Sequence, residues 1–156
     1  MPDRISIRQA RSDDRDFVAG MVPSLLAFGS PAWQDREALA PGFREMLAHA
    51  IGNQGRRSTV LIAEAADGTP LGFISLKVRE DAAGIERAHV ADLAVADSAR
   101  RTGVGTALMK AAESWARDLG MGVLSLDVWS SNETALRFYR HLGYDAESEC
   151  LIKRLD

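Results

Sequence analysis

The sequence predicts a mixed α/β fold, and two patterns along the chain carry that prediction. In the first, an apolar run at residues 90–95 is followed by a helical pattern from about residue 102 to residue 119 and by a second apolar run at residues 123–129. A strand, a helix and a strand at this spacing form a right-handed βαβ unit, whose two strands are parallel neighbours. In the second, Asp67-Gly68 separates two apolar runs, which is typical of an antiparallel hairpin. We therefore expect a sheet with both parallel and antiparallel pairs.

The first half of the chain begins with a short alternating strand and continues with helical patterns. Ser12 or Asp13 can cap a helix that carries apolar residues as far as Leu26, and Pro23 either kinks or splits that helix. Residues 28–41 contain Gly, Pro and Trp and predict a loop, and residues 37–51 carry an apolar stripe that predicts a helix. A turn at residues 81–84 follows the hairpin.

In the second half, residues 102–119 form the clearest helical pattern, because apolar side chains recur there at spacings of three and four. Gly120 is expected to end that helix in a left-handed conformation. Ser130 and Glu133 resemble a capping box, with Ser130 as the N-cap of a helix that reaches Leu142. The expected strands are residues 4–8, 59–64, 71–79, 86–95, 123–129 and 151–155.

Composition limits the classes of protein to which the chain can belong. A length of 156 residues fits one domain, residues 1–156, and 46% apolar and 26% charged residues are ordinary for a globular protein. A net charge of −3 argues against broad nucleic-acid binding, and no apolar run approaches the ~20 residues of a membrane span. The lone Cys150 cannot form an internal disulfide, and no signal peptide precedes the fold, so we expect a cytoplasmic protein.

The turn between the two parallel strands has the features of an anion site. Arg100 and Arg101 supply positive charge, and Gly103 and Gly105 let an anion approach the backbone at the start of a helix, where N–H groups lack partners. No Lys-Ser/Thr pair follows Gly105, so the P-loop pattern fails. Seven residues separate the strand from the first glycine, whereas a dinucleotide-binding turn is tight. The alternative is that the glycines only permit a close strand-to-helix turn.

Two motifs in the second half occur in a fixed order and together resemble one family. They are Leu93-x-Val95 followed by Arg100-x-x-Gly103-x-Gly105, and then Asn132-x-x-Ala135-x-x-Phe138-Tyr139-x-x-x-Gly143-Tyr144. The pair is similar to the acyl-CoA signature and the next motif of the GCN5-related N-acetyltransferases. The resemblance implies the acyl-CoA N-acyltransferase fold, a mixed sheet of six or seven strands with about four helices, whose two central parallel strands splay apart.

The resemblance also implies where acetyl-CoA would bind. Its pantetheine arm would bond to the exposed strand edge at Leu93 and Val95, and Arg100 would hold the loop or the phosphates. The pyrophosphate would rest on the backbone N–H groups of Arg101, Thr102, Gly103, Val104, Gly105 and Thr106. Asn132 either bonds the pantetheine arm or serves the first turn of its helix. Asp97 and Ala99 depart from the family pattern, which often has proline and an aromatic residue there, and Asp97 places negative charge near the proposed anion.

Acetyl transfer from a thioester to an amine needs a base for the amine and a proton for the departing thiolate. Tyr139 is the candidate acid, because a phenol with a pKa of about 10 stays protonated at pH 7; the alternative is a buried core tyrosine. Asp92 is the preferred base, directly or through water, with His89 and a backbone carbonyl as alternatives. The two side chains are three residues apart, which would place them on opposite faces of a regular strand.

Other residues are candidates for the acceptor site, or simply for a core or lid. Asp127 and Trp129 share one face of their expected strand and could line a pocket for the acceptor, together with Phe28 and Trp33. Cys150 could in principle carry the acetyl group, but no histidine lies near it in sequence.

These features predict an acetyl-CoA-dependent N-acetyltransferase that moves an acetyl group to a primary amine by direct attack in a ternary complex. The acceptor would be a small-molecule or peptide amine. No metal, nucleic acid or membrane partner is expected, and the family often forms homodimers. The alternatives are a non-catalytic acyl-CoA-binding or sensor domain of the same fold and a nucleotide-binding dehydrogenase.

Overall fold

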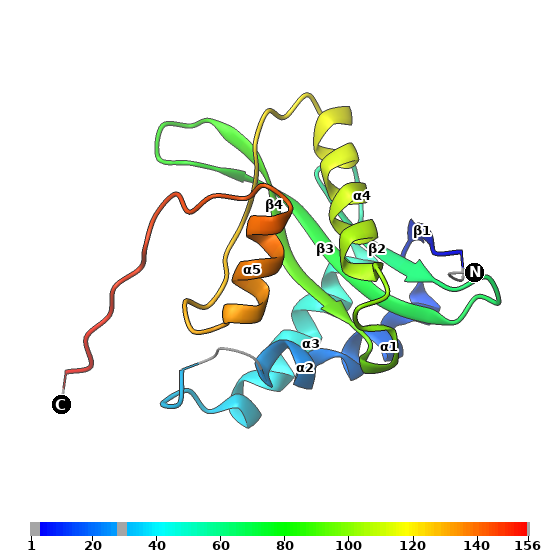
Figure 1. Ribbon diagram of the computed structural model, residues 1–156, viewed down its shortest axis with the longest axis horizontal. Helices are drawn as coiled ribbons and strands as arrows, with labels where there is room; N and C mark the ends of the chain where they lie inside the picture. The colour runs from blue at the N-terminus through cyan, green and yellow to red at the C-terminus, as the bar shows by residue number, and fades with distance from the viewer. Residues whose placement is uncertain (1–3, 28–30, 156) are drawn as a thin grey trace.

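A computed structural model describes residues 4–27 and 31–155. Its centre is one mixed sheet in the order β1-β2-β3-β4-β5 (Figure 1). The first four strands pair antiparallel and β4 pairs parallel with β5, so the predicted mixture of pairings is confirmed. The strands are β1 (Ser6–Gln9), β2 (Ser58–Glu64), β3 (Pro70–Glu80), β4 (Glu86–Val95) and β5 (Leu124–Leu126).

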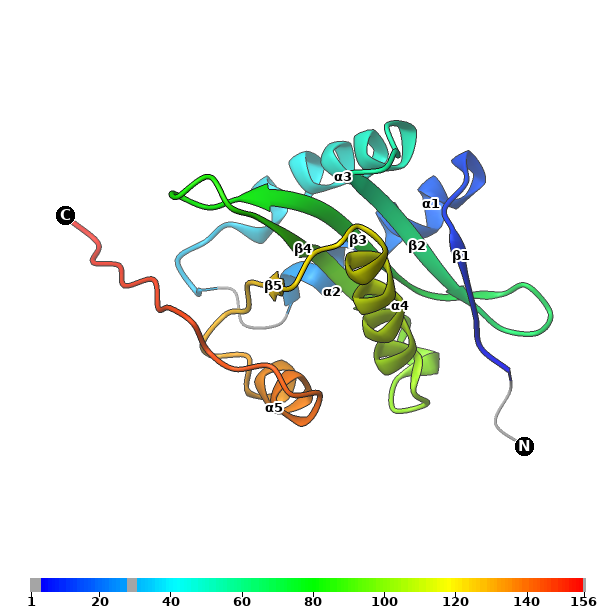
Figure 2. The ribbon, with the colours of Figure 1, turned by 90° about the horizontal axis from the view of Figure 1, so that it is seen from above.

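Helices cover both faces of this sheet (Figure 2). One apolar core lies between the sheet and the N-terminal helices, and a second lies between the opposite face and the C-terminal helices. Phe73 is fully buried in the first core, and Leu108 is fully buried in the second. The helices are α1 (Arg15–Gly20), α2 (Val22–Ala27), α3 (Arg36–Gly52), α4 (Val104–Asp118) and α5 (Glu133–His141), and short 3₁₀ turns occupy Ser12–Asp14 and Asp97–Ala99.

Proline has different effects in the two N-terminal helical patterns. The first pattern is split into α1 and α2, and Pro23 lies in the first turn of α2, where a missing N–H costs nothing. The predicted loop over residues 28–41 is too long, because α3 begins at Arg36 and continues through Pro41. The Asp35 side chain caps this helix by accepting a hydrogen bond from the Ala38 N–H at 3.1 Å. Burial of Leu47 and Ile51 further along the helix offsets the stability lost with the hydrogen bond that Pro41 removes.

The expectation of six or seven strands is wrong for the part of the chain that the structure describes, which has five. Residues 151–155 form no strand, although they alternate as a strand would. β5 is also shorter than predicted, with three residues in place of seven. Both differences have one physical reason: a strand needs a hydrogen-bonded neighbour, and among residues 4–27 and 31–155 β5 has a neighbour on one side alone.

Among the described residues, no helix has the length and apolar character that crossing a membrane requires.

Candidate active site

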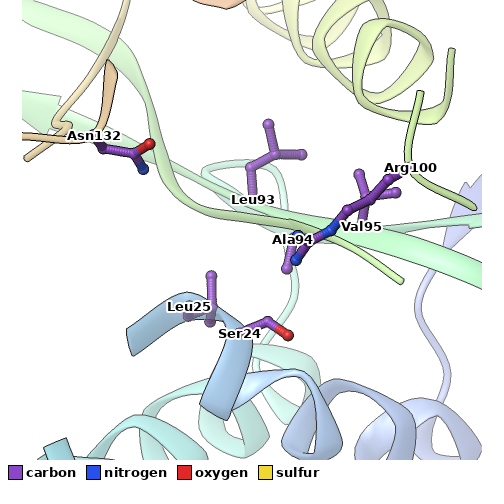
Figure 3. A pocket seen from close by; sticks show the side chains of 7 residues that line it. All are labelled: Ser24, Leu25, Leu93, Ala94, Val95, Arg100 and Asn132. Carbon is purple, nitrogen blue, oxygen red and sulfur yellow. The ribbon is translucent and has the colours of Figure 1, made fainter. Parts of the chain in front are cut away.

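A narrow cleft opens where β4 separates from β5. Pairing between the two strands ends at Val90 and Leu126, but β4 continues to Val95, so its last residues have an exposed edge. The cleft has a volume of about 150 Å³, which suits one arm of a ligand better than a whole drug-sized molecule of ~300–1,000 Å³. Seven residues line it, as Figure 3 shows: Ser24, Leu25, Leu93, Ala94, Val95, Arg100 and Asn132.

Four of the residues predicted to bind the donor therefore meet in one place. Leu93 and Val95 come from β4, Arg100 from the following loop, and Asn132 from the start of α5. Sequence reasoning missed Ser24 and Leu25, which α2 brings to the opposite wall (Figure 3). No local pattern marks them, because their place follows from the packing of α2 near β4.

The loop after β4 is built to present its backbone. Arg101 has a φ of +62° and Gly103 a φ of +88°, so both adopt the left-handed region, which is strained for arginine. The first helical hydrogen bond of α4 runs from the Ala107 N–H to the Gly103 carbonyl at 3.0 Å. The N–H groups of Val104, Gly105 and Thr106 precede that bond, and such groups have no acceptor within their own helix.

Side chains around the loop fix its shape. Asp97 forms a salt bridge with Arg100 at 3.0 Å, so the acidic residue that departs from the family pattern orients an arginine of the cleft. The Thr102 hydroxyl donates to the Ala99 carbonyl, which closes the turn. Gly105 packs closely on α5: a Cβ there would lie 3.2 Å from the Phe138 ring, so a larger residue would displace that ring slightly. The loop, α4 and α5 thus form one packed unit beside the cleft.

Asn132, and not Ser130, is the N-cap of α5. Its side-chain oxygen accepts a hydrogen bond from the Ala135 N–H at 3.2 Å. The predicted capping box at Ser130 is wrong because the chain turns at residues 129–132 before the helix begins, with the Asn132 N–H bonded to the Trp129 carbonyl. Asn132 therefore serves the start of its helix, one of the two roles that the sequence left open, and it also lines the cleft. Its bond to the pantetheine arm stays a prediction.

Tyr139 lies on the α4 and α5 side of the sheet. Its ring packs edge-on against Phe138 and Tyr144, with centroids 5.1 and 6.0 Å away. Burial raises the pKa of its hydroxyl to about 12, so the phenol is protonated at neutral pH. Among the described residues, none forms a hydrogen bond with that hydroxyl, and Tyr139 is not one of the residues that line the cleft.

Asp92 and His89 lie on the same face of β4, contrary to the prediction. His89 is paired with Lys77, and Asp92 is paired with Ser75, two residues earlier in β3. The register shifts between Ser75 and Leu76, so β4 contains one extra residue and both side chains point toward the α1–α3 side. Burial raises the pKa of the Asp92 carboxyl, whose positive neighbour Lys77 opposes the shift.

His89 is engaged in a structural cluster rather than presented to the cleft. Its Nδ1 lies 2.8 Å from the Ser125 hydroxyl of β5, and its Nε2 lies 3.2 Å from the Arg79 guanidinium. The pKa of His89 is lowered to about 4, mainly by burial and secondly by the positive charge of Arg79. The imidazole therefore ties β5 to β4 just before the strands separate, and Asp92 is the stronger candidate for the base.

The acceptor-side candidates lie outside the cleft. Asp127 is exposed and forms a salt bridge with Arg79 at 3.3 Å. Trp129 and Trp33 are 44% and 49% exposed, and neither lines the cleft. Phe28 lies outside the described residues. Cys150 is exposed on the C-terminal segment.

Comparison with known proteins decides the family. A family model described as the acetyltransferase (GNAT) family matches residues 22–144. The chain belongs to this family. An aminoglycoside N(6')-acetyltransferase type 1 from Klebsiella aerogenes is 39% identical over 116 residues, which are 71% of this chain and 76% of that protein. The resemblance drawn from the two motifs is thereby confirmed.

Two solved structures share the fold of this acetyltransferase. A GCN5-related N-acetyltransferase from Ralstonia eutropha JMP134 superposes with a TM-score of 0.77 at 22% identity, covering 97% of this chain and 99% of that one. The aminoglycoside N-acetyltransferase AAC(6')-Iy in complex with CoA superposes with a TM-score of 0.71 at 21% identity, covering 99% and 97%. The protein is a GNAT acetyltransferase that uses acetyl-CoA, and the dehydrogenase alternative is excluded.

The residues present fit such a donor. A narrow cleft beside an exposed strand edge suits a slender arm with amide groups, and an arginine with a helix start suits phosphates. Apart from the residues next to it in the chain, nothing described lies within 4 Å of the position that a Cβ on Gly103 would take, so the backbone there is open to approach. When bound, acetyl-CoA supplies the reactive thioester. Among the described residues, no cluster of metal-binding side chains occurs.

The two candidate caps of α5 can be separated by mutation. We expect Asn132→Ala to lower the free energy of unfolding by about 0.5–2 kcal/mol, because it removes the acceptor for a first-turn N–H. It should also raise the KM for acetyl-CoA, because Asn132 lines the cleft. Ser130→Ala is the matched control and should change neither quantity. Urea unfolding and steady-state kinetics of both variants check this, and equal losses would contradict the assignment of the cap.

The buried His89 predicts a particular pH dependence of stability. The folded state keeps His89 neutral down to a pKa of about 4, whereas the unfolded state takes up a proton near pH 6.5. Stability should therefore fall as the pH falls from 6.5 toward 4, by about 3 kcal/mol at ~1.4 kcal/mol per pKa unit, with no contribution above that range. His89→Gln should reduce the slope of unfolding free energy against pH in this window. An unchanged slope would contradict the burial of a neutral imidazole.

Proposed function

We propose that this acetyltransferase transfers the acetyl group of acetyl-CoA to a primary amine of an aminoglycoside-like polyamine, by direct attack in a ternary complex. The observation that carries the proposal is the placement of Asp92 and Tyr139 on opposite faces of the sheet where β4 leaves β5. Asp92 shares the α1–α3 face with Ala94 of the cleft, whereas Tyr139 packs in the core on the α4 side. Neither side chain lines the cleft itself, so in this proposal the base and the acid act at its border, from the two faces of the sheet.

In this arrangement each side chain has one task. The acceptor amine approaches from the α1–α3 side, where the Asp92 carboxylate takes its proton directly or through water. A carboxyl with a raised pKa holds that proton better than an ordinary aspartate does. The Tyr139 hydroxyl donates its proton to the departing sulfur from the other side. Leu93 and Val95 present their backbone to the arm of the donor, and the loop from Arg100 to Thr106 holds its phosphates.

The acceptor class is inferred from similarity and from charge. The relative at 39% identity carries the name of an aminoglycoside N(6')-acetyltransferase. Aminoglycosides carry several ammonium groups, and the carboxylates of Asp92 and of the exposed Asp127 lie on the acceptor side of β4 and β5. Direct transfer is favoured over an acyl-enzyme because Cys150 lies on the C-terminal segment, away from the residues that line the cleft.

A panel of acceptors tests this proposal. Thiol release from acetyl-CoA should be accelerated by aminoglycosides that carry a 6'-amino group, and mass spectrometry should find one added acetyl group on the acceptor. Aminoglycosides with a hydroxyl at that position, spermidine and a lysine peptide are the controls. Faster release with the peptide or with spermidine would overturn the acceptor class. Binding of acetyl-CoA without turnover on any amine would overturn the reaction.

A further inference from the structure

The cleft beside β4 has an outer end and an inner end. At the outer end it adjoins a more open hollow of about 410 Å³, lined by Pro23, Ser24, Ala27, Asp97 and Arg100. Ser24 and Arg100 line both spaces, so the cleft opens toward the loop that follows β4. In the other direction β4 and β5 come together and pair at Val90 and Leu126. The gap between the two strands is therefore closed at its inner end.

Two leucines narrow the inner part of the cleft from opposite faces of the sheet. Leu25 comes from α2 and packs against the core on the α1–α3 side, whereas Leu93 comes from β4 and packs against the core on the α4 side. Both side chains are half-buried and line the cleft, and in Figure 3 Leu25 points from α2 toward β4. Leu25 does not line the outer hollow, which places it on the inner side of its neighbour Ser24.

The position of Leu25 is fixed by the helix that carries it. Val22 and Leu26 of the same helix are 0% and 7% exposed and anchor α2 in the core. The Leu25 N–H donates to the Met21 carbonyl at 3.2 Å. Close-packed interiors yield little when a group is forced against them. A ligand that needs more room at the inner end would have to move buried residues together with Leu25.

The direction in which the donor lies follows from the difference between the two ends. Phosphates suit the outer end, because Arg100 and the start of α4 lie there. The pantetheine arm then runs inward along Val95 and Leu93, and the thioester lies at the end where Leu25 faces Leu93. This direction rests on the mode of donor binding given under the proposed function. The acyl group consequently meets an apolar wall where the space between the strands ends.

We propose that Leu25 sets the length of the acyl group that this enzyme accepts, by closing the inner end of the cleft to chains longer than acetyl. The donor is then acetyl-CoA, and propionyl-CoA and butyryl-CoA are rejected. An apolar pocket discriminates by about 10–200-fold for one methylene too many. Leu25 is a specificity residue in this account and has no part in proton transfer.

Graded shortening of Leu25 tests this role by binding alone. Leu25→Val removes a methylene from the side chain, and Leu25→Ala removes its whole isopropyl group. In isothermal titration calorimetry the wild type should bind acetyl-CoA at least ~10-fold more tightly than butyryl-CoA. Leu25→Ala should bind butyryl-CoA within a few-fold of acetyl-CoA, because the space it opens is apolar and takes up the longer chain. Leu25→Val should extend acceptance to propionyl-CoA.

CoA without an acyl group is the control ligand, and Leu39→Ala is the control variant. CoA should bind to every variant within a few-fold of its wild-type affinity, which checks that each has folded. Leu39 lies on α3 and does not line the cleft, so Leu39→Ala should keep the wild-type preference for acetyl-CoA. If Leu25→Ala loses CoA binding, Leu25→Val with propionyl-CoA decides the question.

Three results would overturn the proposal. They are equal binding of butyryl-CoA and acetyl-CoA to the wild type, an unchanged preference in Leu25 variants that still bind CoA, and an equal gain of butyryl-CoA binding in Leu39→Ala. No amine is present in these titrations. A failure of the acceptor or of acetyl transfer would therefore appear in the thiol-release assay and leave the binding ratios as they are.

Discussion

Tyr139→Phe should lower the kcat for acetyl transfer by about 10²–10⁴-fold, the usual contribution of a positioned proton donor. The phenol is kept protonated by burial, with a pKa of about 12, and no described residue competes for its hydrogen bond. Phenylalanine retains the edge-on ring contacts with Phe138 and Tyr144, so the fold and the affinity for acetyl-CoA should change little. Steady-state kinetics and a thermal shift with acetyl-CoA measure the two effects separately.

Tyr144→Phe provides the matched control for this experiment. The Tyr144 hydroxyl donates to the Glu113 carboxylate at 3.1 Å, so it is occupied within the fold. Its removal should cost about 1.5–3 kcal/mol of stability, as expected of a hydrogen bond to a charged group, and should leave kcat within a few-fold. Equal turnover in wild type and Tyr139→Phe would remove the hydroxyl from the mechanism.

Asp92→Asn is expected to have the second large effect, a loss of about 10²–10⁴-fold in kcat. An amide matches the carboxylate in shape but cannot take a proton from the amine. The pH profile adds a more specific expectation. Burial raises the pKa of Asp92, and the group works as a base in its ionised form, so the wild-type rate should rise with pH through the raised pKa and then level off. The asparagine variant should lack that rise.

His89→Gln separates Asp92 from the rival base on the same face of β4. The His89 imidazole is enclosed by Ser125 and Arg79, and its pKa of about 4 makes it a weak proton acceptor near neutrality. Its replacement should therefore leave kcat within a few-fold of the wild type. If His89→Gln loses turnover and Asp92→Asn retains it, the assignment of the base is reversed.

Features that depend on short stretches of sequence were predictable. β4 has the predicted bounds, because an apolar run between two turns is a local signal. The prediction of a helix that begins near Gly103 is also confirmed, since its stripe of apolar side chains recurs over four turns and buries Val104 and Leu108. Gly120 ends it with a φ of +74°, the left-handed conformation expected there. The position of the loop between β4 and α4 and that of the cleft edge at Leu93 and Val95 follow from these elements.

Features that depend on a second segment were not predictable from one pattern. The shift in register beside Ser75 places Asp92 and His89 on the same face of β4, where opposite faces were expected. The shift is a property of the pairing between β3 and β4 and not of either strand alone. Ser24 reaches the cleft through the packing of α2, a helix that carries no motif. The choice of Asn132 over Ser130 as a cap follows from the turn that precedes α5. Residues 151–155 pair with no other strand in the part of the chain that the structure describes.

Initial rates of thiol release, measured while acetyl-CoA and an aminoglycoside with a 6'-amino group are both varied, test the central claim most directly. Attack within a ternary complex predicts release that requires both substrates, with double-reciprocal lines that intersect. Parallel lines would indicate an acetylated enzyme and would contradict direct transfer from acetyl-CoA to the amine. Absence of release at any concentration of the amine would contradict the assigned acceptor.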